Sequence, residues 1–153
     1  MLTDGTKSLA FRYLDRRDYS VRELTDKLTE KGVSPEEAEE CCQWLCSLHL
    51  LDDERYAALA VRHYAAKGYG VNRVRQELQR RGVPRELWDA ALEEMPEDTD
   101  TLESLAAARL RGADDRKAVT RAANALIRRG FPPSEVWDVI RRLRRDADGS
   151  GAD

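Results

Sequence analysis

The sequence predicts an all-α protein built from three tandem three-helix units. Apolar residues recur at helical spacing along most of the 153 residues, and no segment alternates as a strand would. A short apolar pattern also ends three times in glycine, at Gly32, Gly82 and Gly130. These glycines lie 50 residues (82 − 32) and 48 residues (130 − 82) apart. A period near 50 that keeps its apolar positions is typical of one supersecondary unit used three times.

The repeat sets the expected domain boundaries. We expect three-helix units at 5–49, 50–96 and 99–145, followed by a disordered tail at 146–153 with its Gly-Ser-Gly run. Units of this size are marginal alone and bury their apolar faces against their neighbours. The sequence therefore predicts an elongated, curved helical-repeat array, a shape suited to a long or large partner.

The first unit carries clear helix start and stop signals. A helix is expected over 6–16. Ser20 and Glu23 then fit a capping box, which predicts a second helix that runs to Lys31 and stops at Gly32. Ser34, with proline as the next residue, predicts the start of the third helix.

The second unit repeats this plan. Asp52 or Asp53 is expected to cap a helix that ends near Ala66. Asn72 is expected to cap a short helix over 73–81, and Pro84 to open the helix that carries Trp88 and Leu92.

The third unit follows the segment 95–98, which we expect to be the joint. Its helices are predicted at 101–110, 118–129 and 134–145. Its basic end holds Arg141, Arg142, Arg144 and Arg145, which could bind an anion or complement a helix dipole.

Charge is segregated along the chain behind a net charge of −3. Residues 54–81 carry 7 basic and 2 acidic side chains, and residues 82–104 carry 1 and 8. The acidic block argues against a protein that binds only DNA. No apolar run reaches the ~18 residues of a membrane helix, and the N-terminus has no signal-peptide pattern. We expect a cytoplasmic protein without membrane contact.

The sequence offers little chemistry for a metal site or for catalysis. Cys42, Cys46 and His49 stand at i, i+4 and i+7 of one predicted helix, a spacing that metal ligands could use. However, Cys42 occupies the position of Leu92 and Ile140 in the sister units, which favours a core role. Neither a phosphate-binding glycine loop nor a catalytic triad is visible. We expect no catalytic residues, no metal and no cofactor.

The strongest candidate site is a basic cluster in the second unit. Unpaired arginines on a short helix suit phosphates or partner carboxylates, which the guanidinium fork grips in pairs. Glu77 can pair at i, i+4 with arginines before and after it, but it cannot neutralise the whole cluster. The candidate partner- or DNA-binding residues are Arg62, Lys67, Arg73, Arg75, Arg80 and Arg81.

Several motifs together resemble the RecX family of regulatory proteins, which modulate the RecA recombinase. The densest likeness runs through Leu-Leu-Asp-Asp-Glu-Arg-Tyr-Ala at 50–57, Lys-Gly-Tyr-Gly at 67–70, and Arg-Val-Arg-Gln-Glu-Leu at 73–78. Two positions depart from the family pattern. His49 stands where the family commonly has glycine, and Val71 where proline often follows the loop.

The resemblance implies a non-catalytic protein that binds the RecA filament on DNA. It further implies inhibition of the ATPase, strand-exchange and coprotease activities of RecA, and hence regulation of recombination and repair. Direct DNA contact is compatible with it, and we expect a monomer. The alternatives are a helical protein that acts on DNA alone and a generic protein-binding scaffold.

Overall fold

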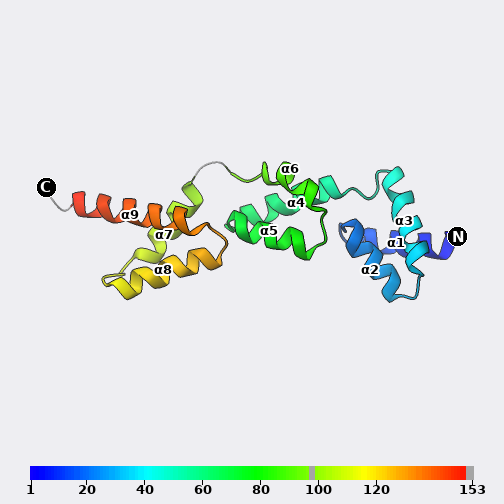
Figure 1. Ribbon diagram of the computed structural model, residues 1–153, viewed down its shortest axis with the longest axis horizontal. Helices are drawn as coiled ribbons and strands as arrows, with labels where there is room; N and C mark the ends of the chain where they lie inside the picture. The colour runs from blue at the N-terminus through cyan, green and yellow to red at the C-terminus, as the bar shows by residue number, and fades with distance from the viewer. Residues whose placement is uncertain (97–98, 151–153) are drawn as a thin grey trace. The chain divides into compact units, whose positions relative to one another are not determined.

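A computed structural model describes residues 1–96 and 99–150, and in that part of the chain the regular structure is entirely helical (Figure 1). The contacts divide the chain into two compact units. One comprises Met1–Ala60 with Glu77–Leu92, and the other comprises Val61–Gln76 with Glu93–Asp153. The all-α prediction is confirmed, and each unit is described by itself below.

The first unit begins with a three-helix bundle of α1 (Asp4–Leu14), α2 (Val21–Glu30) and α3 (Pro35–Ser47). Leu24 and Leu28 of α2 and Leu45 of α3 are completely buried in its core. These are the apolar positions that precede and follow the first repeat glycine, so the repeat pattern locates the core correctly.

The predicted caps of this bundle are confirmed. The Ser20 hydroxyl accepts the N–H of Glu23, and the Glu23 carboxylate accepts the N–H of Ser20, which completes the capping box. Ser34 caps α3 by accepting the N–H of Glu37. Each cap satisfies amides that the first turn of a helix leaves without a partner.

The middle of the sequence forms α4 (Asp53–Ala66), α5 (Val71–Arg80), the 3-10 turn η1 (Arg85–Leu87) and α6 (Trp88–Leu92). Asp52 caps α4 by accepting the N–H groups of Glu54 and Arg55.

The predicted cap of α5 is wrong. This helix begins at Val71, so Asn72 lies in its first turn. The N–H of Asn72 instead donates to the carbonyl of Gly130 at 2.9 Å. A carbonyl from a distant part of the sequence satisfies this amide, and that is why the local pattern misplaced the start.

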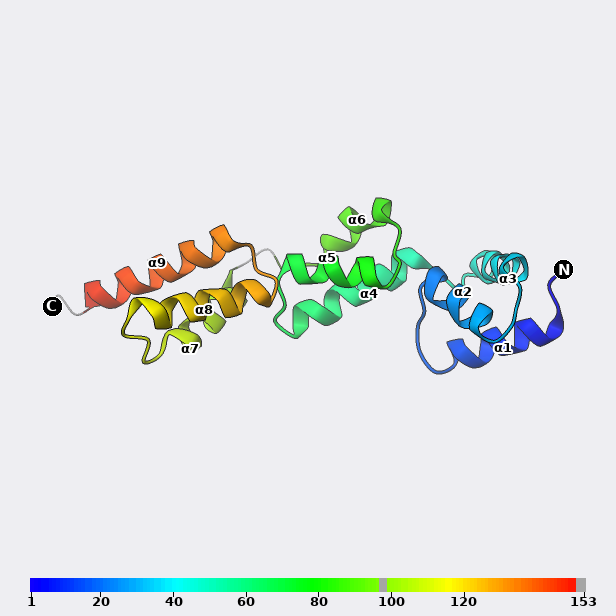
Figure 2. The same cartoon turned by 60° about the horizontal axis from the view of Figure 1, so that its bottom comes forward.

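The second unit contains a bundle of α7 (Asp100–Leu110), α8 (Arg116–Arg128) and α9 (Pro133–Ser150), in which each helix contacts the other two (Figure 2). Its core includes Ala123 and Leu126 of α8 together with Val136 and Ile140 of α9. The bundle lies in the part of the chain where the sequence predicts the third three-helix unit.

The expected disorder from Asp146 onward is wrong as far as Ser150, because α9 continues through these residues. No glycine or proline interrupts the sequence between Arg145 and Asp148, and the glycine at 149 comes only at the end of the helix. Residues 151–153 of the expected tail lie outside the described residues.

Two equivalent junctions join consecutive repeats. In the first unit the Ser20 hydroxyl donates to the carbonyl of Arg81 at 2.6 Å. In the second unit the N–H of Gly70 donates to the carbonyl of Arg129 at 3.1 Å. Ser20 and Gly70 are equivalent in the repeat, as are Arg81 and Arg129. The start of one repeat's second helix therefore holds the end of the next repeat's second helix, and the middle repeat is shared between the two units.

The last repeat begins its second helix differently. Helices α2 and α5 each have 10 residues, whereas α8 has 13 and starts about one turn earlier relative to its glycine. The Asp115 carboxylate caps this added turn by accepting the N–H of Ala118 at 2.7 Å. Asp115 thus caps α8 as Ser20 caps α2, and the difference between these helices is the added turn.

Candidate partner-binding surface

Within the first unit, Arg80 and Arg81 are engaged with one buried carboxylate. Only 5% of Glu77 is exposed, and its Oε2 lies 2.7 Å from Nη2 of Arg80 and 3.6 Å from Nε of Arg81. A buried carboxylate needs such partners because its charge is costly to remove from water. The expectation that this cluster is largely unpaired is therefore wrong for these two arginines.

Arg81 also belongs to a polar network at the first junction. Its Nη1 donates to the hydroxyl of Tyr56 at 2.6 Å. Burial raises the pKa of Tyr56, and its hydrogen bond with Glu23 acts in the same direction. Burial by itself would raise the pKa of Glu23, but hydrogen bonds from Ser20 and Tyr56 and the charges of Arg17 and Arg81 lower it. Arg81 therefore acts mainly in joining the first two repeats.

Within the second unit, Arg62 of α4 pairs with Glu94, a partner that the sequence did not predict. Its Nε donates to Oε2 of Glu94 at 3.0 Å. Both side chains are well exposed, so this pair contributes little stability, typically about 0–1 kcal/mol. A partner could displace it at small cost.

Arg73 is half-buried beside the loop at 67–70. Its guanidinium lies 5.3 Å from the ring centre of Tyr69, and that of Arg129 lies 4.7 Å from the same ring. Arg129 also donates to the carbonyls of Gly68 and Lys67. Arg129 was not among the predicted site residues, although its equivalence to Arg81 in the repeat would have indicated a junction role.

Lys67 and Arg75 differ from the other four candidates in being both exposed and without an ion pair among the described residues. Both side chains are exposed, and within the described part of the chain neither forms an ion pair. Arg62 and Arg80 are also exposed but are paired, and Arg73 and Arg81 are half-buried. We take Lys67 and Arg75 as the centre of the candidate surface.

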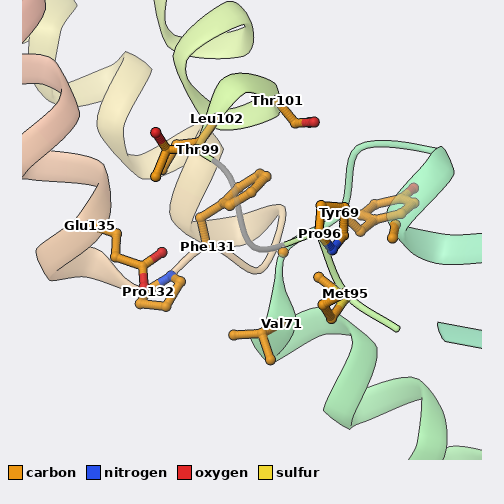
Figure 3. Close-up of a pocket in the computed structure, with 12 residues that line it drawn as sticks. Tyr69, Val71, Met95, Pro96, Thr99, Thr101, Leu102, Phe131, Pro132 and Glu135 are labelled. Atoms are coloured by element: carbon orange, nitrogen blue, oxygen red, sulfur yellow. The ribbon is translucent and has the colours of Figure 1, made fainter. Parts of the chain in front are cut away.

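A small cavity lies in the second unit beside the junction. It has a volume of about 220 Å³, and apolar side chains such as Val71, Met95, Leu102 and Phe131 form much of its wall (Figure 3). Glu135 adds a carboxylate to the lining. The volume is below the roughly 300–1,000 Å³ of typical ligand pockets, so it suits a single side chain better than a cofactor.

Cys41 and Cys42 lie in the core, as their positions in the repeat predict. Both are buried, and Sγ of Cys42 lies 3.3 Å from the hydroxyl of Thr25, whereas Cys46 is exposed. Among the residues that the structure describes, no group of three metal-ligating side chains is arranged to hold an ion. The same residues include no helix that is long and apolar enough to cross a membrane.

The first departure from the family pattern has a structural consequence. His49 follows α3 with a φ of 58°, in the left-handed region that favours glycine. Its N–H donates to the carbonyl of Cys46 at 3.0 Å, and the N–H of Leu50 donates to that of Leu45. These bonds close the helix C-terminus in spite of the unfavourable backbone conformation. At the second departure, Val71 is the first residue of α5.

Comparison with known proteins places the chain in one family. Residues 7–45 match the first three-helix domain of RecX, and residues 52–92 match the second. A "Regulatory protein RecX" from Trichlorobacter lovleyi is 39% identical over 142 residues, which span 88% of this chain and 90% of that protein. One from Vibrio parahaemolyticus is 35% identical over 137 residues, 88% of each chain.

Solved structures agree with this assignment. A crystal structure of a regulatory protein RecX has a TM-score of 0.79 at 26% identity and covers 90% of this chain and 70% of that one. The crystal structure of RecX from Lactobacillus salivarius has a TM-score of 0.80 and 21% identity, with 94% and 95% covered, and supports the fold. The two matched domains and the relatives aligned over most of their length lead to one conclusion: the chain belongs to the RecX family.

Proposed function

We propose that this protein regulates the RecA recombinase by binding RecA filaments on DNA and inhibiting their ATPase, strand-exchange and coprotease activities. The observation that carries the proposal is the match to relatives named as regulatory proteins over most of the chain. The proposed role is one of binding, without a catalytic step, a cofactor or a membrane.

The exposed cations of the second unit provide the chemistry for this contact. Lys67 and Arg75 present open charges, and Arg62 can exchange its exposed carboxylate partner for one on another protein. Guanidinium and ammonium groups bind carboxylates and phosphates alike, so the partner groups are acidic RecA side chains, DNA phosphates or both. Arg80 and Arg81 instead neutralise the buried Glu77 within the first unit.

The test is the ATPase activity of RecA on single-stranded DNA, titrated with this protein from substoichiometric to stoichiometric amounts. The parent should inhibit. The double variant Lys67→Glu/Arg75→Glu should inhibit about tenfold less well, equivalent to about 1.4 kcal/mol of lost binding. Both positions are exposed, so circular dichroism should show the helical content of the parent.

The matched control is Arg12→Glu, an exposed arginine of α1 without an ion pair among the described residues. It should inhibit as the parent does. A parent protein that leaves RecA ATPase unchanged would overturn the proposed function. A folded Lys67→Glu/Arg75→Glu variant that inhibits fully would overturn only the assignment of the surface.

A further inference from the structure

The bundle of α7, α8 and α9 carries two basic grooves that the proposed function does not use. The first has a volume of about 350 Å³ and is lined by Arg109, Arg111 and Arg121. Its remaining lining residues are small: Gly112, Ala113, Ala118 and Ala122. Small side chains let a ligand backbone come close to the protein, and no acidic side chain lines this groove.

The second groove has a volume of about 460 Å³ and lies where α8 meets α9. It is lined by Arg116, Val119 and Thr120 of α8 and by Trp137 and Arg144 of α9. Trp137 is only half-buried, so part of its ring is accessible between elements that each contribute an arginine. An accessible indole with guanidinium groups beside it combines a stacking surface with anion binding.

The arginines of both grooves lack internal carboxylate partners. Within the described residues, none of Arg109, Arg111, Arg116, Arg121 and Arg144 forms an ion pair. The neighbouring Arg141 and Arg142 do form pairs, with Asp138 and Glu103. Asp138 and Glu103 therefore neutralise arginines outside the grooves and do not pair with the arginines that line them.

The start of α8 lies between the two grooves and adds to their positive charge. Ala118, Arg121 and Ala122 line one groove, and Arg116, Val119 and Thr120 line the other. The first turn of α8 holds Arg116 and Lys117 and no acidic residue, although helix N-termini favour acids there. Asp115 offsets part of this charge through its cap. A bound anion would stabilise the positive charge that remains at the start of α8.

We propose that the two grooves bind a single strand of nucleic acid, with its phosphates on the arginines and a base stacked on Trp137. This site is separate from the Lys67 and Arg75 surface, and its binding requires no RecA. A second copy of this chain is a poorer occupant. If it docked as the junctions do, it would place the end of its first repeat's second helix, Lys31-Gly32, at the start of α8. Lys31 is exposed, so its positive charge would lie beside the groove arginines. An acidic protein segment would use the arginines but not the accessible part of the Trp137 ring.

The direct test is the fluorescence anisotropy of a labelled oligo-dT, titrated with the full chain at low salt. The parent should bind, and its affinity should fall steeply with added salt as phosphate contacts release counterions. Two double variants, Arg111→Glu/Arg121→Glu and Arg116→Glu/Arg144→Glu, should each weaken binding by about tenfold or more. The control Arg128→Glu changes an exposed arginine of α8 outside both grooves and should have little effect.

The fluorescence of Trp137 provides a second measurement. Added oligo-dT would leave this fluorescence unchanged if Trp137 only stabilised the fold. Oligo-dT should quench part of the tryptophan emission of the parent, and Trp137→Phe should lose that quenching while it keeps helicity and most of the affinity. The proposal fails if the parent does not bind, or if Arg128→Glu weakens binding as much as the groove variants. It also fails if duplex DNA or polyglutamate competes as well as the single strand. None of these results bears on RecA inhibition.

Discussion

Gly130 provides a sharp test of the repeat junction. Its φ of +105° lies in the left-handed region, and a Cβ added there would approach Cβ of Arg73 to 2.4 Å. The same Cβ would lie 2.5 Å from the backbone nitrogen of Arg73 and 2.9 Å from the carbonyl oxygen of Gly70. These atoms are backbone or directly attached to it, so they cannot rotate away. Gly130→Ala must therefore open the junction.

The cost can be worked from this geometry. The left-handed conformation costs alanine about 1–2 kcal/mol. Opening the junction weakens two backbone hydrogen bonds, from Gly70 to Arg129 and from Asn72 to Gly130, at about 1 kcal/mol each. We expect Gly130→Ala to lower the free energy of unfolding by about 3–4 kcal/mol.

Gly32 supplies the matched control. It is equivalent to Gly130 in the repeat and has a φ of +92°, but an added Cβ would meet nothing within 4 Å. Gly32→Ala should therefore lose only the conformational part, about 1–2 kcal/mol. Urea unfolding followed by far-ultraviolet circular dichroism measures both losses. Equal losses for the two variants would refute the reasoning, because the junction would then add nothing.

Three further predictions follow from single sites. His49→Gly should raise the free energy of unfolding by about 0.5–1 kcal/mol, because glycine adopts the left-handed conformation freely; a loss in urea unfolding would contradict this. Despite its burial, Glu23 has a pKa held below 4.5 by Ser20 and Tyr56, so its stabilisation is complete above 4.5 and is lost as pH falls through the folded value. Glu23→Gln should flatten the acid side of the stability–pH curve, and an unchanged slope there would count against the network. Burial raises the pKa of Cys41 to about 11, so near-neutral iodoacetamide should label Cys41 far more slowly in the native protein than in urea. Rapid native labelling, or stoichiometric zinc in the purified protein, would exclude a core role.

Local signals predicted the helices well because the residues that end a helix stand next to it. The Ser20 and Glu23 capping box, the Ser34 cap and the buried Leu24 and Leu28 all depend on neighbours within a few turns. The left-handed glycine that ends each repeat's second helix is local in the same way.

Contacts between distant residues were beyond such reasoning. Arg62 and Glu94 are 32 positions apart, and Ser20 and Arg81 are 61 apart. The sequence therefore identified a basic cluster correctly as a set of cations but could not tell which were already paired. Likewise, the start of α5 is fixed by a carbonyl of Gly130, which no pattern near Asn72 could reveal.

The added turn of α8 bears on whether further copies of this chain can join its last repeat. A head-to-tail contact that does not close into a ring can add further copies without limit. In both junctions the start of a second helix donates hydrogen bonds to the next repeat, from the Ser20 hydroxyl in one and from the N–H groups of Gly70 and Asn72 in the other. Helix α8 begins about one turn earlier relative to its glycine than α2 and α5 do. We expect this added turn to hinder a further copy from docking on α8 as the next repeats dock on α2 and α5.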